Sequence, residues 1–267
     1  MCDENSGNII LRMEEVYMED LFEFYLKDSK KKFSGWDFSY VEETGRMVEF
    51  PLEWSYTSKI LEKIRNADFL LDMGTGGGEF LSLLQPLPVN SYATEGYEPN
   101  LPISKKRLEP LGVNVVKIKE DNCLDFENDF FDLVLNRHEE YLEKEVKRVL
   151  KQNGYFITQQ VGGKNCIELN KILGSVDGFG MTEWELDYAV SELREVGLKI
   201  IEKCESFPKL RFYDIGAIIY YLKAVPWQIT DFSIDKYYDS LKKVHNKIQE
   251  KGFIDIKEHR FLIVAQK

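Results

Sequence analysis

The sequence predicts an α/β fold in which helices flank a mostly parallel sheet. Between residues 68 and 161, short apolar runs alternate with amphipathic stretches, a pattern typical of βα units. A glycine-rich turn at 72–78 follows the first apolar run and precedes a helix-like segment, as the connection inside such a unit requires. The runs predicted as strands, in chain order, are 69–72, 91–95, 113–118, 132–135 and 155–158.

Helices are predicted between and after these strands from caps and apolar spacing. Residues 100–112 begin with an asparagine cap and a proline in the first turn, and they end at a glycine. Residues 142–150 carry a second apolar stripe, and residues 182–197 open with capping-box spacing before an apolar face. We expect all three helices to cover the sheet.

The two remaining parts of the chain depart from this alternation. An amphipathic helix is predicted at 14–26, two further helices at 214–223 and 234–249, and a last strand at 259–266. The predicted division is an N-terminal helical cap at 1–56, a core at 57–205, a C-terminal helical insertion or lid at 206–252, and the last core strand at 253–267.

Composition limits the classes of partner. A net charge of −11 disfavours nucleic acid, because affinity for a polyanion comes largely from lysine and arginine. No stretch approaches the roughly 20 apolar residues of a membrane-spanning helix, and the acidic start MCDENSGN lacks a secretory signal, so a cytoplasmic protein is expected. The four cysteines are too widely spaced for a CxxC metal-ligand pair, and no metal site is expected.

The spacing of the glycine-rich turn separates the classes of nucleotide ligand. Counted from Gly74, a dinucleotide fingerprint would need glycine at position 79, which is Glu79. The lysine and hydroxyl pair of a phosphate-binding Walker loop is also absent. The turn instead reads D-x-G-x-G-x-G from Asp72 to Gly78, and the next predicted strand ends in Glu95, one βαβ step later.

This pattern resembles the first motif of the Rossmann-like, class I methyltransferases that use S-adenosylmethionine, in particular the type 11-like family. The resemblance continues through Glu120 and Asp121 and the strand at 131–135, and it covers roughly residues 57 to 161. One departure lies at 150–154, where LKQNG replaces the frequent L-x-P-G-G turn. The resemblance implies a seven-stranded sheet and S-adenosylmethionine as the cofactor.

The resemblance also implies the cofactor contacts. Asp72 and the glycine backbone would hold the methionine end, Glu95 the ribose, and Glu120 or Asp121 the adenine. Each has a plainer alternative: an ordinary turn, a solvated strand end, and loop acids. The residues expected to bind the cofactor are Asp72, Gly74, Thr75, Gly76, Gly78, Glu95, Glu120, Asp121 and Asn136.

The segment after the fourth strand should face the transferred methyl group, because ligands lie beyond the carboxyl ends of parallel strands. There His138 is predicted as a general base, and Glu139 either orients it or begins the next helix. A base is optional in an in-line displacement, so His138 could equally be structural. Arg137 is predicted to clamp an anionic acceptor, with a surface ion pair as the alternative.

Aromatic residues outside the core supply a predicted acceptor pocket. Trp54 and Tyr56 precede the core and Trp227 lies in the late insertion, where they could close over the reacting centre or simply fill a hydrophobic core. Gln159 and Gln160 end the fifth strand and could donate hydrogen bonds to an acceptor, although a plain strand exit is the simpler reading.

Three functions fit these features. The first is methyl transfer to a small molecule, with the acceptor atom and oligomeric state left open. The second is methylation of an RNA base, which would stack on Trp54 or Trp227 but is disfavoured by the acidic composition. The third is a protein that binds S-adenosylmethionine without turnover, because a fold alone does not establish activity.

Overall fold

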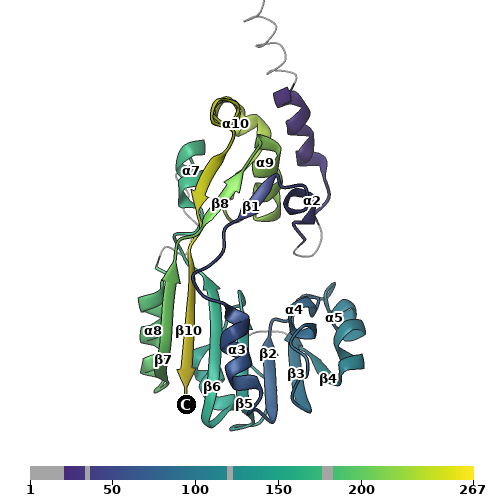
Figure 1. Cartoon of the computed structure of the whole chain (residues 1–267), viewed down its shortest axis with the longest axis vertical. Helices are drawn as coiled ribbons and strands as arrows, with labels where there is room; N and C mark the ends of the chain where they lie inside the picture. Colours follow the sequence, from purple (N-terminus) through teal and green to yellow (C-terminus); the bar gives the residue numbers. More distant parts are fainter. Residues whose placement is uncertain (1–20, 34–36, 119–122, 176–182) are drawn as a thin grey trace, which may run out of the picture. The chain divides into compact units, whose positions relative to one another are not determined.

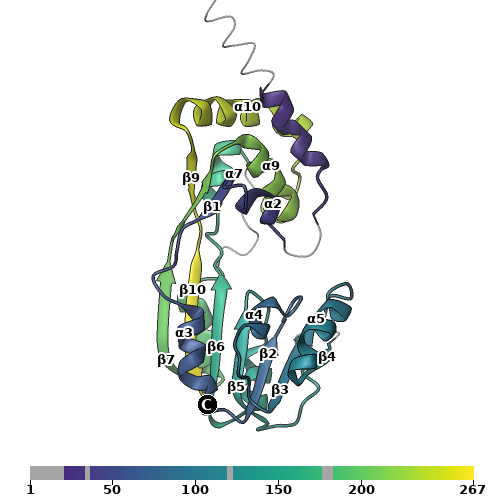
Figure 2. The ribbon, with the colours of Figure 1, turned by 45° about the vertical axis from the view of Figure 1, so that its right-hand side comes forward.

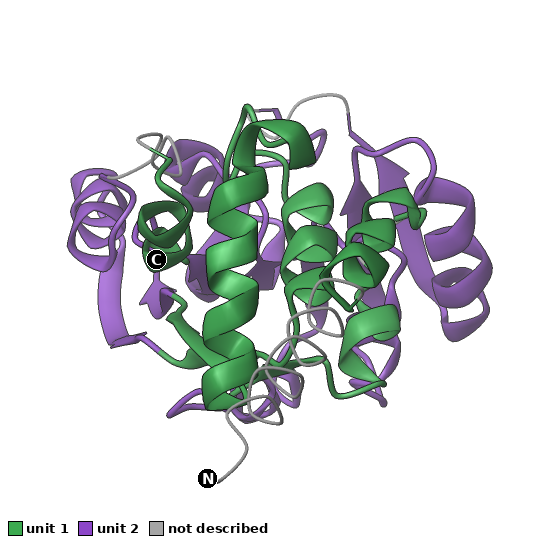
Figure 3. Ribbon diagram, turned by 90° about the horizontal axis from the view of Figure 1, so that it is seen from above, with its two compact units in different colours: residues 1–50, 166–180, 208–258 green, residues 51–165, 181–207, 259–267 purple. Residues whose placement is uncertain are grey.

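The computed structural model describes residues 21–33, 37–118, 123–175 and 183–267. The chain divides into two compact units, each assembled from three separate stretches of sequence (Figure 3). Unit 1 comprises 1–50, 166–180 and 208–258, and unit 2 comprises 51–165, 181–207 and 259–267. The predicted four-part division of the chain stays a prediction.

Unit 2 is built on a seven-stranded sheet in the order β4-β3-β2-β5-β6-β10-β7 (Figure 1). Neighbours from β4 to β6 pair in parallel, whereas β10 pairs antiparallel with both β6 and β7. The predicted α/β fold with a mostly parallel seven-stranded sheet is therefore confirmed. The strands are β2 (Phe69–Met73), β3 (Asn90–Glu95), β4 (Val113–Lys117), β5 (Phe131–Arg137), β6 (Leu150–Val161), β7 (Lys199–Ser206) and β10 (Arg260–Gln266).

Helices cover both faces of this sheet because successive side chains of each strand point to opposite sides. Leu70 packs into a core with α3 (Tyr56–Ile64), α4 (Glu79–Ser82) and α5 (Leu101–Leu108). Its neighbour Leu71 packs into a second core with α6 (Glu143–Val149) and α8 (Leu186–Glu195). The result is a three-layer arrangement that leaves the ends of the strands to carry polar residues.

Unit 1 has a small antiparallel sheet, β1 (Met47–Glu49), β8 (Lys209–Phe212) and β9 (Ile254–Lys257), in the order β1-β8-β9. The helices of unit 1 lie beside this sheet (Figure 2), and their buried residues belong to one apolar cluster. α9 is buried along nearly its whole length, and its N-cap Asp214 also accepts hydrogen bonds from the Arg46 guanidinium. The helical elements are η1 (Lys27–Lys30), α2 (Ser39–Glu42), α7 (Ile167–Leu173), α9 (Ile215–Ala224) and α10 (Ile234–Lys251).

The helices predicted at 214–223 and 234–249 are confirmed as α9 and α10. Residues 14–20 of the helix predicted at 14–26 lie outside the described residues, and 21–26 are helical. No helix within the described part of the chain combines the length and the apolar character needed to cross a membrane.

Candidate active site

The glycine loop connects β2 to α4 and has a backbone that only glycine adopts easily. Gly74, Gly76 and Gly78 have φ of +63°, +62° and +79°, in the left-handed region. The loop is tied to the end of β3, because the Thr75 amide donates to the Thr94 carbonyl oxygen at 2.9 Å. A Cβ at Gly78 would lie 2.7 Å from Leu108 Cγ in α5, so this glycine also permits close packing. Between these anchors an added Cβ at Gly76 would have nothing within 4 Å, so the backbone there is a surface against which a ligand can lie.

Asp72 is the penultimate residue of β2, two residues before Gly74, and is only 5% exposed. Burial raises the pKa of its carboxyl group to about 6, although the nearby Thr75 hydroxyl and the positive charge of Arg137 lower it. The Thr75 hydroxyl oxygen is itself buried without a well-formed hydrogen bond. A buried carboxyl group in this state is stabilised as an anion by a cationic ligand.

Glu95 ends the neighbouring strand β3 and is also 5% exposed. One carboxylate oxygen accepts from the Tyr97 amide at 2.6 Å, and the other lies 3.5 Å from the Asn100 side-chain nitrogen. The short bond fixes the orientation of the carboxylate, while the long one leaves acceptor capacity suited to hydroxyl groups.

Asn136 lies near the end of β5, paired in register with Met73 of β2, and is fully buried. Its side-chain oxygen accepts from the Thr158 hydroxyl at 2.8 Å and from the Gln160 amide at 2.6 Å. These two donors orient the Asn136 amide, whose Nδ2 has no hydrogen-bond partner. A buried donor without a partner costs free energy, which a bound acceptor group would offset.

Glu139 lies against the glycine loop. A Cβ at Gly74 would be 2.3 Å from Glu139 Cγ and 2.4 Å from its Oε2. The structure thus brings together Asp72, Gly74 and Glu139, and it puts the Glu139 carboxylate beside the loop. Glu120 and Asp121, the two acids expected at the adenine, lie outside the described residues.

His138 follows β5 in a left-handed conformation with φ of +62°, which is uncommon for a residue with a side chain. Its amide donates to the Gln159 carbonyl at 2.9 Å, and its Nε2 lies 3.4 Å from the Gln159 side-chain nitrogen. Loss of hydration lowers the pKa of the imidazole, and the positive charges of Arg260 and Arg137 lower it further. His138 as a whole residue is nevertheless exposed to solvent. Because its pKa is lowered, the imidazole is neutral at neutral pH.

The aromatic residues expected in an acceptor pocket take different positions. Tyr56 is buried, with its hydroxyl donating to the main-chain oxygens of Asn136 at 3.0 Å and Ile157 at 3.3 Å. Trp54 is half-buried, and its indole nitrogen donates to Gln159 Oε1 at 2.9 Å. Trp227 belongs to unit 1 and is 45% exposed, so its place in an acceptor pocket stays a prediction.

Arg137 is exposed at the end of β5, and its guanidinium carbon lies 4.9 Å from the centre of the Phe80 ring. That contact holds the cation over α4 on the same side as the glycine loop. Thr158 and Arg260 were not predicted from the sequence as residues of the site. Thr158 is the polar residue that directly follows the apolar run 155–157 of β6, and Arg260 is the charged residue that begins the apolar strand β10, opposite Val161 at the end of β6, so the sequence carried a usable signal for both.

The Tyr56 hydroxyl bonds predict a contribution to stability. In Tyr56→Phe, two buried main-chain oxygens lose a donor, and the free energy of unfolding should fall by roughly 1–3 kcal/mol. Urea denaturation measures this, with Tyr188→Phe as the control because Tyr188 is 47% exposed on α8. Equal stability of the two variants would contradict the supporting role of the hydroxyl.

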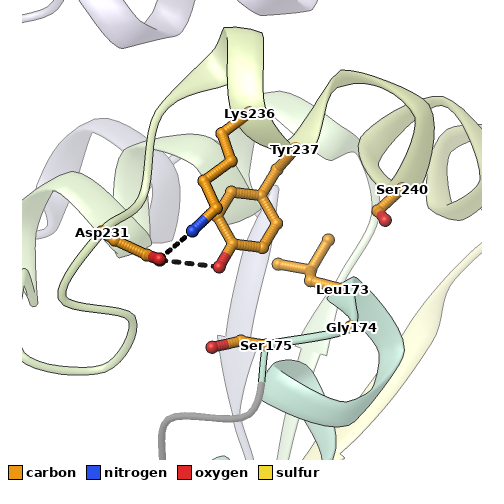
Figure 4. A pocket seen from close by; sticks show the side chains of 7 residues that line it. All are labelled: Leu173, Gly174, Ser175, Asp231, Lys236, Tyr237 and Ser240. Carbon is orange, nitrogen blue, oxygen red and sulfur yellow. Dashed lines mark hydrogen bonds and ion pairs between the residues drawn. The ribbon is translucent and has the colours of Figure 1, made fainter.

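A separate hollow of about 310 Å³ lies in unit 1, between the end of α7 and the first turns of α10 (Figure 4). Its polar groups bond to one another, since Asp231 pairs with Lys236 and accepts from the Tyr237 hydroxyl. It contains none of the glycine-loop features and we assign it no function. Among the described residues, no group of three or more histidine, cysteine or acidic side chains could hold a metal ion.

The residues around the glycine loop fit S-adenosylmethionine. They offer an open backbone at Gly76, where an added Cβ would have nothing within 4 Å, a buried carboxyl group for the positive charges of the methionine end, and an oriented carboxylate for hydroxyl groups. The unpartnered Asn136 donor and the Thr75 hydroxyl complete a set of groups that a bound polar ligand would satisfy.

Comparison with known proteins agrees with this fit. A family model described as a methyltransferase domain matches residues 71–158, which span β2 to β6. No curated protein sequence matches the chain.

Solved structures share the fold at low sequence identity. A candidate methyltransferase from Bacillus halodurans C-125 has a TM-score of 0.53 and 17% identity over 79% of this chain and 99% of that one. The YcgJ protein from Bacillus subtilis has a TM-score of 0.53 and 15% identity over 79% of this chain and 97% of that one. A protein of unknown function from Deinococcus radiodurans R1 has a TM-score of 0.58 and 11% identity over 86% of this chain and 99% of that one. These structures show that the fold is shared, and the match at 71–158 shows a methyltransferase domain in this chain, which together with the glycine-loop geometry supports a methyltransferase that depends on S-adenosylmethionine.

Proposed function

We propose that this methyltransferase acts on a small-molecule acceptor bound at the carboxyl ends of β5 and β6, in the cytoplasm. The observation that carries the proposal is the position of Glu139 and His138. They are adjacent residues, and Glu139 lies against Gly74 of the glycine loop. The acidic composition, with a net charge of −11, supports a small acceptor over an RNA.

On the cofactor side, S-adenosylmethionine supplies an electrophilic methyl group on a sulfonium. Asp72 would stabilise positive charge at the methionine end, and Gly74, Thr75, Gly76 and Gly78 would allow close approach of the backbone. Glu95 would accept from the ribose hydroxyls, and Asn136 would donate through its unpartnered Nδ2. Glu120 or Asp121 would meet the adenine.

On the acceptor side, Arg137 and His138 would contact the acceptor, and Trp54 would form a wall of its pocket. The Tyr56 hydroxyl, which donates to the main-chain oxygens of Asn136 in β5 and Ile157 in β6, would support the pocket rather than touch the acceptor. Trp227 would belong to the pocket only if unit 1 contributes to it.

The experiment is transfer of a labelled methyl group. Purified protein would be incubated with methyl-labelled S-adenosylmethionine and either a small-molecule extract or total RNA. Label in the small-molecule fraction supports the proposal, and label in RNA that resists high salt supports the alternative of RNA methylation. Tight cofactor binding with no label in either would favour a protein that binds the cofactor without turnover.

Glu95 offers a specific prediction for the cofactor. Glu95→Gln keeps the size of the side chain but loses the charge that strengthens bonds to hydroxyl groups, so affinity for S-adenosylmethionine should fall about tenfold. Calorimetric titration measures this. Glu98→Gln is the control, because Glu98 is exposed and pairs with Lys117. Unchanged affinity in a folded Glu95→Gln protein would remove Glu95 from the cofactor site.

A further inference from the structure

Three side chains of unit 2 form a hydrogen-bonded series, Trp54 to Gln159 to His138. The Trp54 indole nitrogen lies 2.9 Å from Gln159 Oε1, and the Gln159 side-chain nitrogen lies 3.4 Å from His138 Nε2. Gln159 is 5% exposed, so these partners replace water for most of its amide. The series ends on the residue next to Glu139, whose side chain lies against Gly74 of the glycine loop.

The first member of the series sets the direction of the others. An indole N–H can only donate, so the Gln159 atom facing Trp54 must be the oxygen. The Gln159 NH₂ group therefore faces His138 and donates to its Nε2. A neutral imidazole whose Nε2 accepts a hydrogen bond carries its proton on Nδ1.

The surroundings of His138 keep its ring neutral and place two positive charges near it. Loss of hydration lowers the pKa of the ring most, and the positive charges of Arg260 and Arg137 lower it further. Arg260 also donates to Asn165 Oδ1 at 2.6 Å, which fixes this guanidinium at the start of β10. A ring with its only N–H on Nδ1, close to two cations, is suited to donate to an anionic oxygen and poorly suited to remove a proton through Nε2.

We propose that Trp54 and Gln159 fix His138 as the Nδ1–H tautomer, and that His138 binds an oxyanion of the methyl acceptor as a hydrogen-bond donor. The inference rests on the proposed function, in which His138 faces the acceptor. It narrows the acceptor class to molecules bearing a carboxylate or another anionic oxygen. Gln159 and Trp54 are positioning residues that act through His138.

The tautomer is tested first, without any acceptor. Nitrogen-15 NMR of imidazole-labelled protein at pH 7 should show His138 with a protonated Nδ1 and an unprotonated Nε2. In Gln159→Glu, a carboxylate accepts from Trp54 and from His138, so the proton should move to Nε2. Gln152→Glu is the matched control on the exposed end of β6, and it should leave the tautomer unchanged.

A second variant covers the case in which Gln159→Glu fails to fold. Trp54→Phe removes the indole donor at a half-buried position, which releases the Gln159 amide and should give a mixture of both tautomers. A wild-type protein with its proton on Nε2, or a Trp54→Phe protein with an unchanged tautomer, would overturn the proposal.

Donation to an oxyanion is tested with sodium benzoate as an aromatic carboxylate probe, in the presence of S-adenosylmethionine. Benzoate should shift the His138 Nδ1 resonance saturably. His138→Asn keeps an N–H donor and tolerates the left-handed backbone, whereas His138→Gly keeps only the backbone. Benzoate should bind His138→Gly at least about fivefold more weakly than His138→Asn, since one hydrogen bond to a charged group is lost.

Equal benzoate affinity of the two variants, or no binding to the wild type, would overturn the donor role. Cofactor binding is tested separately, by calorimetric titration of the wild type and the same variants with S-adenosylmethionine. Failure of cofactor binding in wild-type protein would count against the proposed function, whereas the tautomer result would stand.

Discussion

Gly74→Ala should abolish measurable binding of S-adenosylmethionine, with a loss of affinity of about 100-fold or more, equivalent to roughly 3 kcal/mol. A Cβ at this position meets the Glu139 side chain at 2.3 Å and the backbone has φ of +63°. The added methyl group would displace the Glu139 side chain, which lies where the Cβ would go, and would crowd the loop at which the cofactor is proposed to bind. Calorimetric titration and thermal unfolding of the same preparation separate binding from stability.

Gly112→Ala is the matched control for Gly74→Ala. Gly112 follows the 3-10 helix η2 (Glu109–Leu111), has φ of +83° and has nothing within 4 Å of its added Cβ, so it reproduces the backbone strain without an obstruction. Both variants should lose roughly 1–2 kcal/mol of stability from the left-handed conformation. Only Gly74→Ala should lose affinity for S-adenosylmethionine. Equal affinity of the two variants for S-adenosylmethionine would show that the loop does not contact the cofactor.

Asp72→Asn should weaken cofactor binding about 100-fold while making the free protein more stable at pH 7 to 8, an opposition typical of functional sites. Burial raises the pKa of the folded carboxyl group to about 6, above its ordinary value of 3.8. The folded state therefore binds more protons than the unfolded state between these values, and stability falls as pH rises through this window. Removing the buried charge should recover up to roughly 3 kcal/mol above pH 6.

The same shift predicts how cofactor affinity depends on pH in the wild type. A cationic ligand requires Asp72 ionised, so binding below pH 6 must release a proton and affinity should fall up to about tenfold per pH unit. Calorimetry in buffers of different ionisation enthalpy measures how many protons are released when the cofactor binds. Asp72→Asn should remove the pH dependence, and the exposed Asp187→Asn should keep it. A wild-type affinity that is flat from pH 5 to pH 7 would contradict this role of Asp72.

The core of the fold was predictable because its strands are buried on both faces. Runs such as 69–72 and 132–135 are continuous apolar segments bounded by turns, and each is a strand in the structure. β7 was not recognised, because this edge strand alternates exposed charged residues with partly buried ones and has little apolar content. β1, β8 and β9 are strands of three or four residues, too short to show a period.

The cofactor loop was predictable from sequence because its determinants are local. Left-handed backbone at Gly74, Gly76 and Gly78 requires glycine wherever the chain has this turn. The position of Gln159 between Trp54 and His138 was not predictable, because the residues come from three distant points in the chain. The place of Glu139 against Gly74 depends on the pairing of β2 with β5, which fixes its distance from the loop only after folding.

The central claim is that the glycine loop of unit 2 binds S-adenosylmethionine, and one titration tests it most directly. Wild-type and Gly74→Ala protein, each shown to be folded, would be titrated by calorimetry with S-adenosylmethionine and separately with NAD. The account predicts saturable one-to-one binding of S-adenosylmethionine to the wild type alone, and no binding of NAD to either protein. Binding of S-adenosylmethionine with equal affinity to both proteins, or to neither, would contradict it.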